Sequence, residues 1–334
     1  MRRGRLGPGA EFDRIRSLLA AAGADRPGNG GGLGPGDDAA VLEVPEGERL
    51  VVGTDLQVEE VHFRRAWVGW ETVGWRAATA ALSDLAAMAA RPLGLLLSAA
   101  LPPELDRGVL DEIGDGLGRC LREHGGDLLG GDLSRSPGPV VLDAVGLGTA
   151  ARPVERGGGR PGDELWVTGR LGAAAAAVAA RSRNLEPEPE LVRAFDRPRP
   201  RVAEARWLAE RVELRAMIDL SDGLAGDAGH LAAASGTAAV VRADRVPLAG
   251  PLEGWSDRSR ALRYAAAGGE DFELLAAIPP GALEETAGAF ADRFGVELTR
   301  VGRLEQGRGV SWLGADGREV EPPGGGFDHF GGGA

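Results

Sequence analysis

The sequence predicts an α/β (α+β) protein with two domains. Short segments rich in Val and Leu, such as 49–55 and 139–145, have the length and composition of strands. A longer segment rich in Ala, Leu and Arg at 71–90 is typical of a helix. The chain has 334 residues, of which 43% are hydrophobic, so it exceeds the usual size of one domain and can bury a sizeable core.

A break in composition separates the two predicted domains. At 152–163, glycine, proline and charged residues replace the periodic apolar pattern, and a predicted strand at 164–168 follows. We therefore expect an N-terminal domain at 1–150 and a C-terminal domain at 151–334. A second stretch rich in helix breakers, 186–200, is expected to be an exposed loop between two helices that carries no chemistry.

The charge and hydropathy of the chain exclude two classes of partner. A formal net charge of -12 would repel nucleic acid and anionic membrane surfaces, but it favours magnesium or a cationic substrate. The apolar runs at 93–101 and 171–180 are much shorter than the roughly 20 residues of a membrane helix. No apolar stretch follows Met1-Arg2-Arg3 as it would in a signal peptide. We expect a cytoplasmic protein that binds neither nucleic acid nor membrane.

Lysine is absent from the sequence, so all 38 basic residues are arginines. A phosphate loop of the Walker A type needs a lysine and is therefore excluded. Any phosphate that this chain binds must be neutralised by arginine, backbone amides and metal ions. A GC-rich coding bias explains the missing lysine, and the chemical consequence is the same. The lone Cys120 is expected to be a small packed apolar residue.

Acidic residues recur beside glycines or near the ends of predicted strands, where side chains reach solvent. The first motif holds Asp37 and Asp38, and the second is Thr54-Asp55, with His62 seven residues later. Because adjacent residues of an extended chain point apart, only one of Asp37 and Asp38 is expected to face a shared ion. Hard oxygen ligands of this kind suit Mg²⁺.

Two further motifs of the N-terminal half also have structural explanations. Asp84 interrupts a predicted helix rich in Ala and Leu, where a lone carboxylate can instead be a cap or a core hydrogen-bonding group. Gly130-Gly131-Asp132 lets the backbone approach a phosphate while Asp132 holds a metal ion on it. A simple turn is the alternative for these three residues.

The C-terminal half contributes the motif Asp219-Leu220-Ser221-Asp222, which places two carboxylates and a hydroxyl between an apolar strand and a helix start. Helix capping would explain Asp222. It does not explain Asp219, which ends a strand and is costly to bury without a cation or hydrogen-bond donors.

The last acidic motif is Gly268-Gly269-Glu270-Asp271, before an apolar strand, and a hairpin turn is its alternative explanation. Each of these motifs is weak alone. Magnesium holds a nucleotide through only one or two carboxylates per ion, so several ions require several scattered acids. The motifs together therefore favour a site for magnesium and a nucleotide.

The order of these motifs resembles the thiamine-monophosphate kinase family over nearly the whole chain. The likeness lies in Gly-Asp-Asp-Ala-Ala, Thr-Asp followed by His-Phe, Ser-Asp-Leu-Ala-Ala-Met, Gly-Gly-Asp, Asp-Leu-Ser-Asp-Gly-Leu and Gly-Gly-Glu-Asp. It is most specific at 83–92 and 219–236. The resemblance implies the two-domain fold of aminoimidazole ribonucleotide synthetase. It also implies that the N-terminal domain binds ATP and magnesium, that N-terminal sheets form a homodimer interface, and that the C-terminal α/β domain completes the active site.

The resemblance also implies roles for individual residues. The implied magnesium ligands are Asp38, Thr54, Asp55, Asp84, Asp132, Asp219 and Asp222. The implied ATP contacts are Gly131, Asp132, Arg156 and Ser221, and the implied substrate contacts are His62, Glu270 and Phe327. Asp132, Asp219 and Arg156 are the expected catalytic residues.

The sequence departs from the family pattern at three places. These departures bear on how many metal ions bind and on the contacts of the Gly-Gly-Asp segment, but not on the implied reaction. Gly53 stands where relatives often have a hydroxyl residue, Leu133-Ser134 replaces a common Thr-Thr, and Phe327 replaces a common Tyr. Gly53 can still offer its carbonyl. Phe327 can still stack on a cationic thiazolium ring, and a simple docking role for this Phe is the alternative.

The implied reaction moves the γ-phosphoryl group of ATP in line onto the phosphate of thiamine monophosphate, giving thiamine diphosphate and ADP. A phosphate monoester has a second pKa of about 6, so the acceptor is largely dianionic at neutral pH and needs no general base. Several Mg²⁺ ions and Arg156 would reduce the repulsion between two anions. His62 is expected to bind phosphate, and a hydrogen bond at a strand end is the alternative.

Two other functions remain open at this stage. One is another ATP-using member of the same superfamily, such as aminoimidazole ribonucleotide synthetase. Selenophosphate synthetase and a hydrogenase-maturation carbamoyl dehydratase fit less well because the reactive cysteine that each needs is missing from the expected place. The other is a non-catalytic acidic protein that stores divalent ions, which ATP turnover would distinguish.

Overall fold

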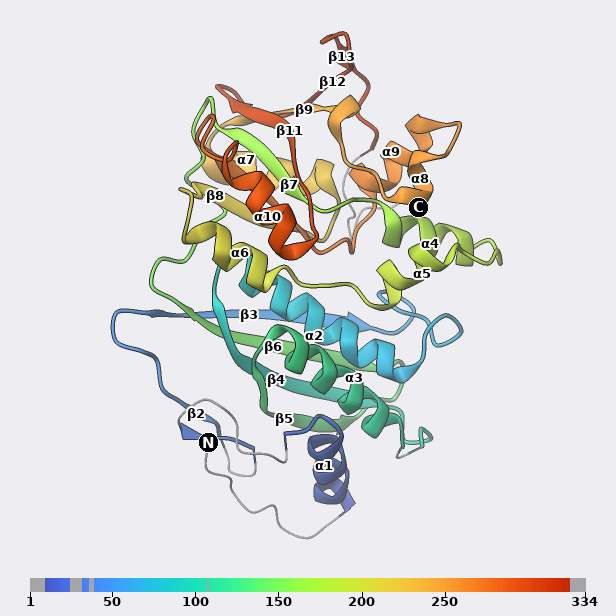
Figure 1. Cartoon of the computed structure of the whole chain (residues 1–334). Helices are drawn as coiled ribbons and strands as arrows, with labels where there is room; N and C mark the ends of the chain where they lie inside the picture. The colour runs from blue at the N-terminus through green and yellow to red at the C-terminus, as the bar shows by residue number, and fades with distance from the viewer. Residues whose placement is uncertain (1–9, 25–31, 36–38, 107, 325–334) are drawn as a thin grey trace. The chain divides into compact units, whose positions relative to one another are not determined.

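The computed structural model describes residues 10–24, 32–35, 39–106 and 108–324 (Figure 1). These residues form two compact units. The first unit contains the described residues up to 86 together with 90–153, and the second contains 87–89 and the described residues from 154 onward.

The first unit is a four-stranded sheet with helices over one face (Figure 1). Its strands lie in the order β3-β6-β4-β5, and every neighbouring pair is antiparallel except β4 and β5. β1 and β2 form a separate two-stranded pair. The elements are α1 (Ala10–Ala21), β1 (Gly32–Leu33), β2 (Val41–Leu42), β3 (Arg49–Val58), α2 (Trp70–Ala87), β4 (Arg91–Leu101), α3 (Gly108–His124), β5 (Asp127–Arg135) and β6 (Val141–Ala150).

Glycines bring the backbones of α2 and α3 into direct contact. A Cβ at Gly74 would lie 1.9 Å from the carbonyl oxygen of Ile113, and one at Gly116 would lie 1.8 Å from that of Glu71. No larger residue fits at either position without separating the two helices. This close packing buries most of α2 against the sheet, so Asp84, on this helix, is held in the interior layer of the unit.

The other face of the sheet is open along β3. Leu50, Val52 and Leu56 alternate with buried or half-buried residues and are themselves 48%, 56% and 51% exposed. The period of two is that of a strand with one covered face and one uncovered face. The dimer interface implied by the family resemblance falls on this sheet and stays a prediction.

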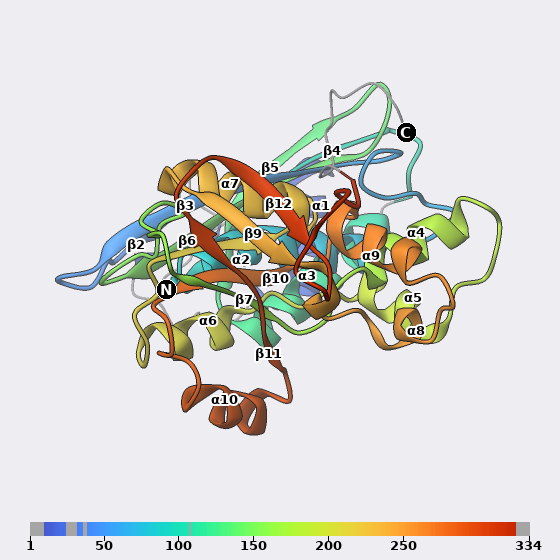
Figure 2. The same ribbon diagram turned by 90° about the horizontal axis from the view of Figure 1, so that it is seen from above.

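The second unit is built on a seven-stranded sheet in the order β13-β12-β9-β11-β7-β10-β8. Only β9 and β12 are a parallel pair among the described strands of this sheet. Figure 2 shows α7 and α10 on opposite sides of it. The elements are β7 (Glu164–Thr168), α4 (Ala173–Arg181), α5 (Pro189–Asp196), α6 (Val202–Ala209), β8 (Ala216–Leu220), α7 (Leu224–Ser235), β9 (Ala238–Arg242), a 3₁₀ turn η1 (Ala243–Arg245), α8 (Gly250–Glu253), α9 (Arg258–Ala267), β10 (Glu273–Ile278), α10 (Thr286–Phe294), β11 (Leu298–Glu305), β12 (Gly309–Leu313) and β13 (Glu319–Val320).

The predicted strand at 164–168 and the predicted helix at 71–90 are confirmed by β7 and α2. Cys120 is fully buried in α3, with its sulfur 3.5 Å from the hydroxyl of Thr79, which confirms the prediction of a packed residue. Among the described residues, no helix combines the length and the apolar character required to cross a bilayer.

The prediction of an exposed loop at 186–200 is wrong. Residues Pro189–Asp196 form α5, which buries Leu191 and Phe195. A proline in the first turn of a helix lacks only an N–H that would have no partner there, so Pro189 favours a helix start. The sequence prediction counted this proline as a breaker without considering its position.

Two turn explanations are also wrong. Gly130, Gly131 and Asp132 lie inside β5, where Gly131 pairs with Leu97 of β4. A Cβ at Gly131 would be 1.8 Å from the Leu97 carbonyl oxygen, so close strand pairing requires this glycine. The segment 268–272 is not a hairpin either, because it connects α9 to β10.

Candidate functional site

Two carboxylates lie on the helix-covered face of the first sheet. Asp84 of α2 places its Oδ2 3.1 Å from the position that a Cβ would occupy at Gly53 of β3. Asp55 is two residues further along β3 and so shares the face of Gly53. The side-chain amide of Gln57 donates from Nε2 to Asp55 Oδ1 over 2.9 Å. Asp55 and Asp84 therefore form a neighbouring acidic pair, and a side chain at position 53 would press on Asp84.

Thr54 is exposed on the opposite face of the same sheet. Its hydroxyl donates to Asp143 Oδ1 of β6 over 2.5 Å. Ser98 of β4 pairs with both Asp143 and Asp132, so these side chains form a row across three strands. With neighbouring strands about 4.8 Å apart, Asp132 lies about 10 Å from Asp143. Strand alternation thus separates Thr54 from Asp55, and Asp143 is an acid near Thr54 that the sequence analysis did not identify.

A cavity of about 590 Å³ lies in the first unit. Its wall is mainly apolar, with polar groups from β4 and β5. Gly131 and Asp132, two predicted ATP contacts, are part of that wall, and so is Ser98. The cavity has the volume and the apolar lining that are typical of small-molecule sites.

His62 is held in the turn that follows β3. The backbone N–H of Val58 donates to His62 Nδ1 over 3.0 Å, so the neutral imidazole carries its proton on Nε2. Arg76, buried in α2, lies with one guanidinium nitrogen 3.4 Å from the His62 carbonyl oxygen. The buried carboxylate of Glu59 accepts the N–H of Val140 over 2.9 Å and fixes the start of the same turn.

The predicted acids of the second unit lie where β8 leads into α7. Asp219 is buried near the end of β8, and Ser221 and Asp222 occupy the connection. Gly223 follows with φ of 99°, a conformation that favours glycine, and a Cβ there would lie 2.7 Å from the Ala266 carbonyl oxygen. Asp222 donates its N–H to the side chain of Asp227 and does not cap α7 itself.

Asp227 is a member of this cluster that the sequence analysis missed. It lies in the first turn of α7, only 2% exposed, and its Oδ2 accepts the Asp222 N–H over 3.1 Å. Burial raises the pKa of Asp227 to about 8, and the negative charge of Asp219 adds to the rise, while the Asp222 N–H and Arg156 oppose it. The sequence feature that could have identified Asp227 is its position as a lone carboxylate among the Ala, Gly and Leu residues of this helix.

Arg156 is exposed in the segment before β7, and its positive charge acts on Asp227. The N–H of Met217 in β8 donates to the carbonyl oxygen of Glu155 over 3.1 Å, so this segment runs beside β8. The structure therefore brings together the predicted residues Arg156, Asp219 and Asp222.

The connection that carries Glu270 is hydrogen-bonded to the end of β8 and the residue that follows it. The N–H of Glu270 donates to the Ser221 carbonyl oxygen over 2.9 Å, and that of Phe272 to the Leu220 carbonyl oxygen over 3.0 Å. Glu270 and Phe272 have φ of 71° and 50°, a left-handed conformation that residues with a Cβ adopt rarely and at a cost of about 1–3 kcal/mol each. Such strain is concentrated at functional sites, where the surrounding structure holds it.

Asp271, between these two residues, faces another element. Its Oδ2 accepts the N–H of Gly172 over 2.8 Å at the start of α4, and the backbone N–H of Ala174 also donates to it. Burial raises the pKa of Asp271 well above its usual range, and the two backbone amides act in the opposite direction.

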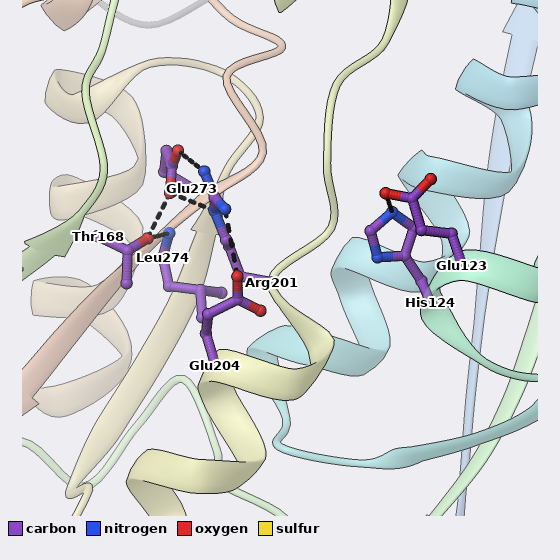
Figure 3. Close-up of polar contacts among 7 residues, drawn as sticks. All are labelled: Glu123, His124, Thr168, Arg201, Glu204, Glu273 and Leu274. Carbon is purple, nitrogen blue, oxygen red and sulfur yellow. Dashed lines mark hydrogen bonds and ion pairs between the residues drawn. The ribbon is translucent and has the colours of Figure 1, made fainter. Parts of the chain in front are cut away.

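A buried ion pair closes the other end of this connection (Figure 3). Arg201 donates from Nε to Glu273 Oε2 over 2.7 Å and from a second nitrogen to Oε1 over 2.5 Å. The Thr168 hydroxyl donates to Glu273 Oε2 over 2.6 Å, and Glu204 accepts from Arg201 over 3.2 Å. Burial works against the charged guanidinium, but the Glu273 and Glu204 carboxylates together outweigh it and keep the pKa of Arg201 above its usual value.

The described residues contain no group of three or more His, Cys, Asp or Glu side chains arranged to hold a metal ion. The neighbouring acids are the pair Asp55 and Asp84 and the trio Asp219, Asp222 and Asp227, and neither set is arranged as such a group. Two predicted site residues, Asp38 and Phe327, lie outside the described residues.

Comparisons with known proteins agree on one family. The AIR synthase related protein family matches the chain with its N-terminal domain at residues 36–150 and with its C-terminal domain at 160–313. The thiamine-monophosphate kinase of Salmonella typhimurium is 36% identical over 96% of this chain and 95% of its own length.

Solved structures give the same result. The crystal structure of thiamine-monophosphate kinase from Stenotrophomonas maltophilia K279a is 33% identical, covers 94% of this chain and 98% of its own, and has a TM-score of 0.79. AaThiL complexed with AMPPCP and TMP is 30% identical, covers 88% and 91%, and has a TM-score of 0.74. With two matched domains, this identity and this coverage, the chain belongs to the thiamine-monophosphate kinase family of the AIR synthase related proteins.

Proposed function

We propose that this protein transfers the γ-phosphoryl group of ATP directly to thiamine monophosphate, giving thiamine diphosphate and ADP. The observation that carries the proposal is the cluster of acids Asp219, Asp222 and Asp227 at the start of α7, where Asp227 accepts the Asp222 N–H and the charge of Asp219 adds to the rise that burial causes in the Asp227 pKa. Phosphoryl transfer needs a cation between anionic groups, and such a cluster attracts one. AaThiL, a relative in sequence and structure, is complexed with AMPPCP and TMP.

Magnesium fits the acids that the structure describes. It needs only one or two carboxylates and keeps several waters, so two acids suffice even though the described residues hold no group of three arranged around a metal ion. In the first unit Asp55 and Asp84 would hold an ion, and in the second Asp219 and Asp222 would do so. Asp38, Thr54 and Asp132 remain proposed ligands; Thr54 would serve on the face of Asp143, away from Asp55. Bound magnesium would supply charge neutralisation of the phosphate groups.

The proposed nucleotide contacts of the first unit are Gly131 and Asp132 in the wall of the cavity. A nucleotide base and ribose suit its apolar lining, and the polar edge near Asp132 suits the phosphates. In the second unit, Arg156 and Ser221 are the proposed contacts. Arg156 can bind a phosphate oxygen through two N–H groups, and it already lies among acids that would bind the accompanying cation.

The acceptor needs positioning rather than deprotonation. Its phosphate is largely dianionic at neutral pH, so a nucleophilic oxygen is present without a general base. His62 presents a donor for such an oxygen, because the Val58 N–H occupies Nδ1 and leaves the proton on Nε2. Glu270 and Phe327 remain proposed contacts to thiamine, with the carboxylate of Glu270 suited to a cationic ring.

The direct test is to incubate the protein with ATP, Mg²⁺ and thiamine monophosphate and to measure thiamine diphosphate and ADP by chromatography. We expect equal amounts of the two products and none in EDTA. Release of inorganic phosphate without thiamine diphosphate, by folded protein, would overturn the assignment. A reaction that gives ADP only with a different acceptor would instead identify another member of the superfamily.

We also propose a homodimer formed through the open face of the first sheet. The exposed Leu50, Val52 and Leu56 on β3 support it, because such an apolar row is unfavourable in water unless covered. Light scattering of the native protein and of a Val52→Glu variant tests this point. A monomeric native protein at micromolar concentration would contradict it.

A further inference from the structure

The connection between α9 and β10 is held in an unfavourable shape from two sides. Glu270 and Phe272 are both left-handed, although neither is a glycine. On one side their N–H groups donate to the carbonyl oxygens of Ser221 and Leu220. These bonds hold the connection against β8 and the residues that follow it. They involve Glu270 and Phe272, so they do not fix the side chain of Asp271, which lies between them.

Asp271 is that residue, and its carboxylate anchors the other side. It accepts the Gly172 N–H over 2.8 Å and the N–H of Ala174, at the first turn of α4. The first N–H groups of a helix have no partner within the helix, and a side-chain oxygen at the N-cap position usually accepts from them. Here the N-cap is Gly172, which has no side chain to supply it.

A local cap cannot replace Asp271. Gly172 has φ of 89°, and a Cβ at this position would lie 2.9 Å from the Ala265 nitrogen and 3.0 Å from a methyl carbon of Leu252. Serine or threonine at 172 would therefore be strained and crowded. The cap instead comes from 99 residues further along the chain, which ties the start of α4 to the connection carrying Glu270.

The neighbouring contacts make the connection sensitive to this one side chain. A Cβ at Gly269 would lie 2.2 Å from the Ser221 carbonyl oxygen, so the two connections touch through their backbones. If Asp271 released α4, Glu270 and Phe272 could relax to ordinary backbone angles. A change of φ at Glu270 would turn the direction in which its side chain points.

We propose that Asp271 is a positioning residue for the reaction: its carboxylate, bound to the start of α4, keeps the strained 268–272 connection in the shape that presents Glu270 to the substrate. The inference rests on the proposed function, which makes Glu270 a contact to thiamine monophosphate. It assigns no contact between Asp271 and the substrate itself.

The test compares Asp271→Ala and Asp271→Asn with a matched control in the same unit. Asp257 also caps a helix, since its Oδ1 accepts the Arg260 N–H over 3.0 Å at the start of α9. It is exposed, and α9 leads directly into the 268–272 connection, so Asp257→Ala removes a cap without touching Asp271. The measurements are kcat, the KM values for thiamine monophosphate and ATP, and the thermal unfolding midpoint.

We expect Asp271→Ala to raise the KM for thiamine monophosphate by about tenfold or more, while the KM for ATP changes less than threefold. Asp271→Asn keeps one carbonyl acceptor and should recover most of the loss, which also provides a variant that folds if the alanine variant does not. Asp257→Ala should lower the unfolding midpoint with both KM values unchanged.

Three outcomes would overturn the inference. One is a lower unfolding midpoint in Asp271→Ala with unchanged kinetics, which would make Asp271 a helix cap alone. Another is an equal rise of both KM values, and the third is the same kinetic change in Asp257→Ala. Failure of the proposed function is separate, because the unsubstituted protein would then form no thiamine diphosphate.

Discussion

Two groups of buried acids include residues of the neighbouring strands β8 and β10 of the second unit, and they differ in the charges that surround them. Glu273 opens β10 and pairs with Leu220 of β8, one residue from Asp219. It receives two N–H groups of Arg201 and the hydroxyl of Thr168. Glu204 also accepts from Arg201, so both carboxylates of this group are bonded directly to the guanidinium, and the group is complete without a ligand.

The cluster at the start of α7 is not balanced in this way. The charges that act most on Asp227 are those of Asp219, Asp222 and Arg156, which are two acids and one base. Burial raises the pKa of Asp227 most, the negative charges of Asp219 and Asp222 add to the rise, and a cation from solvent would offset those charges. The comparison teaches that burial alone does not decide the role of an acid: Glu273 and Glu204 bond directly to a guanidinium, whereas Asp227 accepts a backbone N–H and lies beside two other acids.

The largest expected effect comes from Asp219→Asn. Removing this carboxylate should lower kcat by about a thousandfold, the scale on which a single group that stabilises transition-state charge acts. Stability in EDTA should be unchanged or higher, because a charge is lost from a crowded acidic cluster. Product formation at saturating ATP and thermal unfolding measure the two quantities. Retained turnover would remove Asp219 from the proposed magnesium ligands.

Arg201→Ala should instead lower the stability of the protein much more than its kcat. It leaves Glu273 buried without its cation, which typically costs about 3–5 kcal/mol of unfolding free energy. Arg201→Lys keeps the charge but loses the two-nitrogen fork, so its unfolding free energy should lie between those of the alanine variant and the native protein. Denaturant unfolding gives the free energies. A cost below about 1 kcal/mol for the alanine variant would show that the ion pair is not the closed structural group described above.

Magnesium should distinguish the two groups in a third way. At a hundred times its dissociation constant, a bound ion raises the free energy of unfolding by about 2.7 kcal/mol. We expect that gain in the native protein and in Arg201→Ala, and a much smaller gain in Asp219→Asn. Thermal unfolding with and without Mg²⁺ measures it. Equal gains in all three proteins would mean that the ion binds elsewhere.

The effect expected per pH unit is the smallest, at most about 1.4 kcal/mol, and concerns the pH dependence of stability in EDTA. The folded pKa of Asp227 is about 8, whereas an unfolded Asp titrates near pH 4. Between about pH 4 and pH 8 the folded state therefore holds a proton that the unfolded state has released, so stability falls as the pH rises through this range. Asp227→Asn should flatten that decline while its side-chain oxygen still accepts the Asp222 N–H. Identical slopes in the two proteins would contradict the raised pKa.

Regular elements and most of the acidic candidates were readable from the sequence because they depend on local pattern. The strand at 164–168 and the helix at 71–90 follow from the spacing of apolar residues. Asp219 was identifiable because a carboxylate at the end of an apolar strand is costly to bury unpaired. The same local method was wrong at Pro189, where one proline can start a helix as readily as end one.

Other features depended on residues distant in sequence and could not be predicted. Strand alternation already implied that Thr54 and Asp55 point apart, but only the sheet showed that Thr54 reaches Asp143. Asp227 looked like an ordinary helical residue until packing placed it beside Asp219.

The sequence by itself determined that this chain has no lysine, and it predicted phosphate chemistry through acids spaced along strands and connections. Only the tertiary structure decided which of those acids bond to a buried guanidinium and which are packed beside other acids. Sequence specifies the type of each charge, but the pKa and the role of a carboxylate depend on burial and on neighbours brought together by folding. Glu273 and Asp219 are both buried acids, and the positions of Arg201 and Asp227 give them different roles.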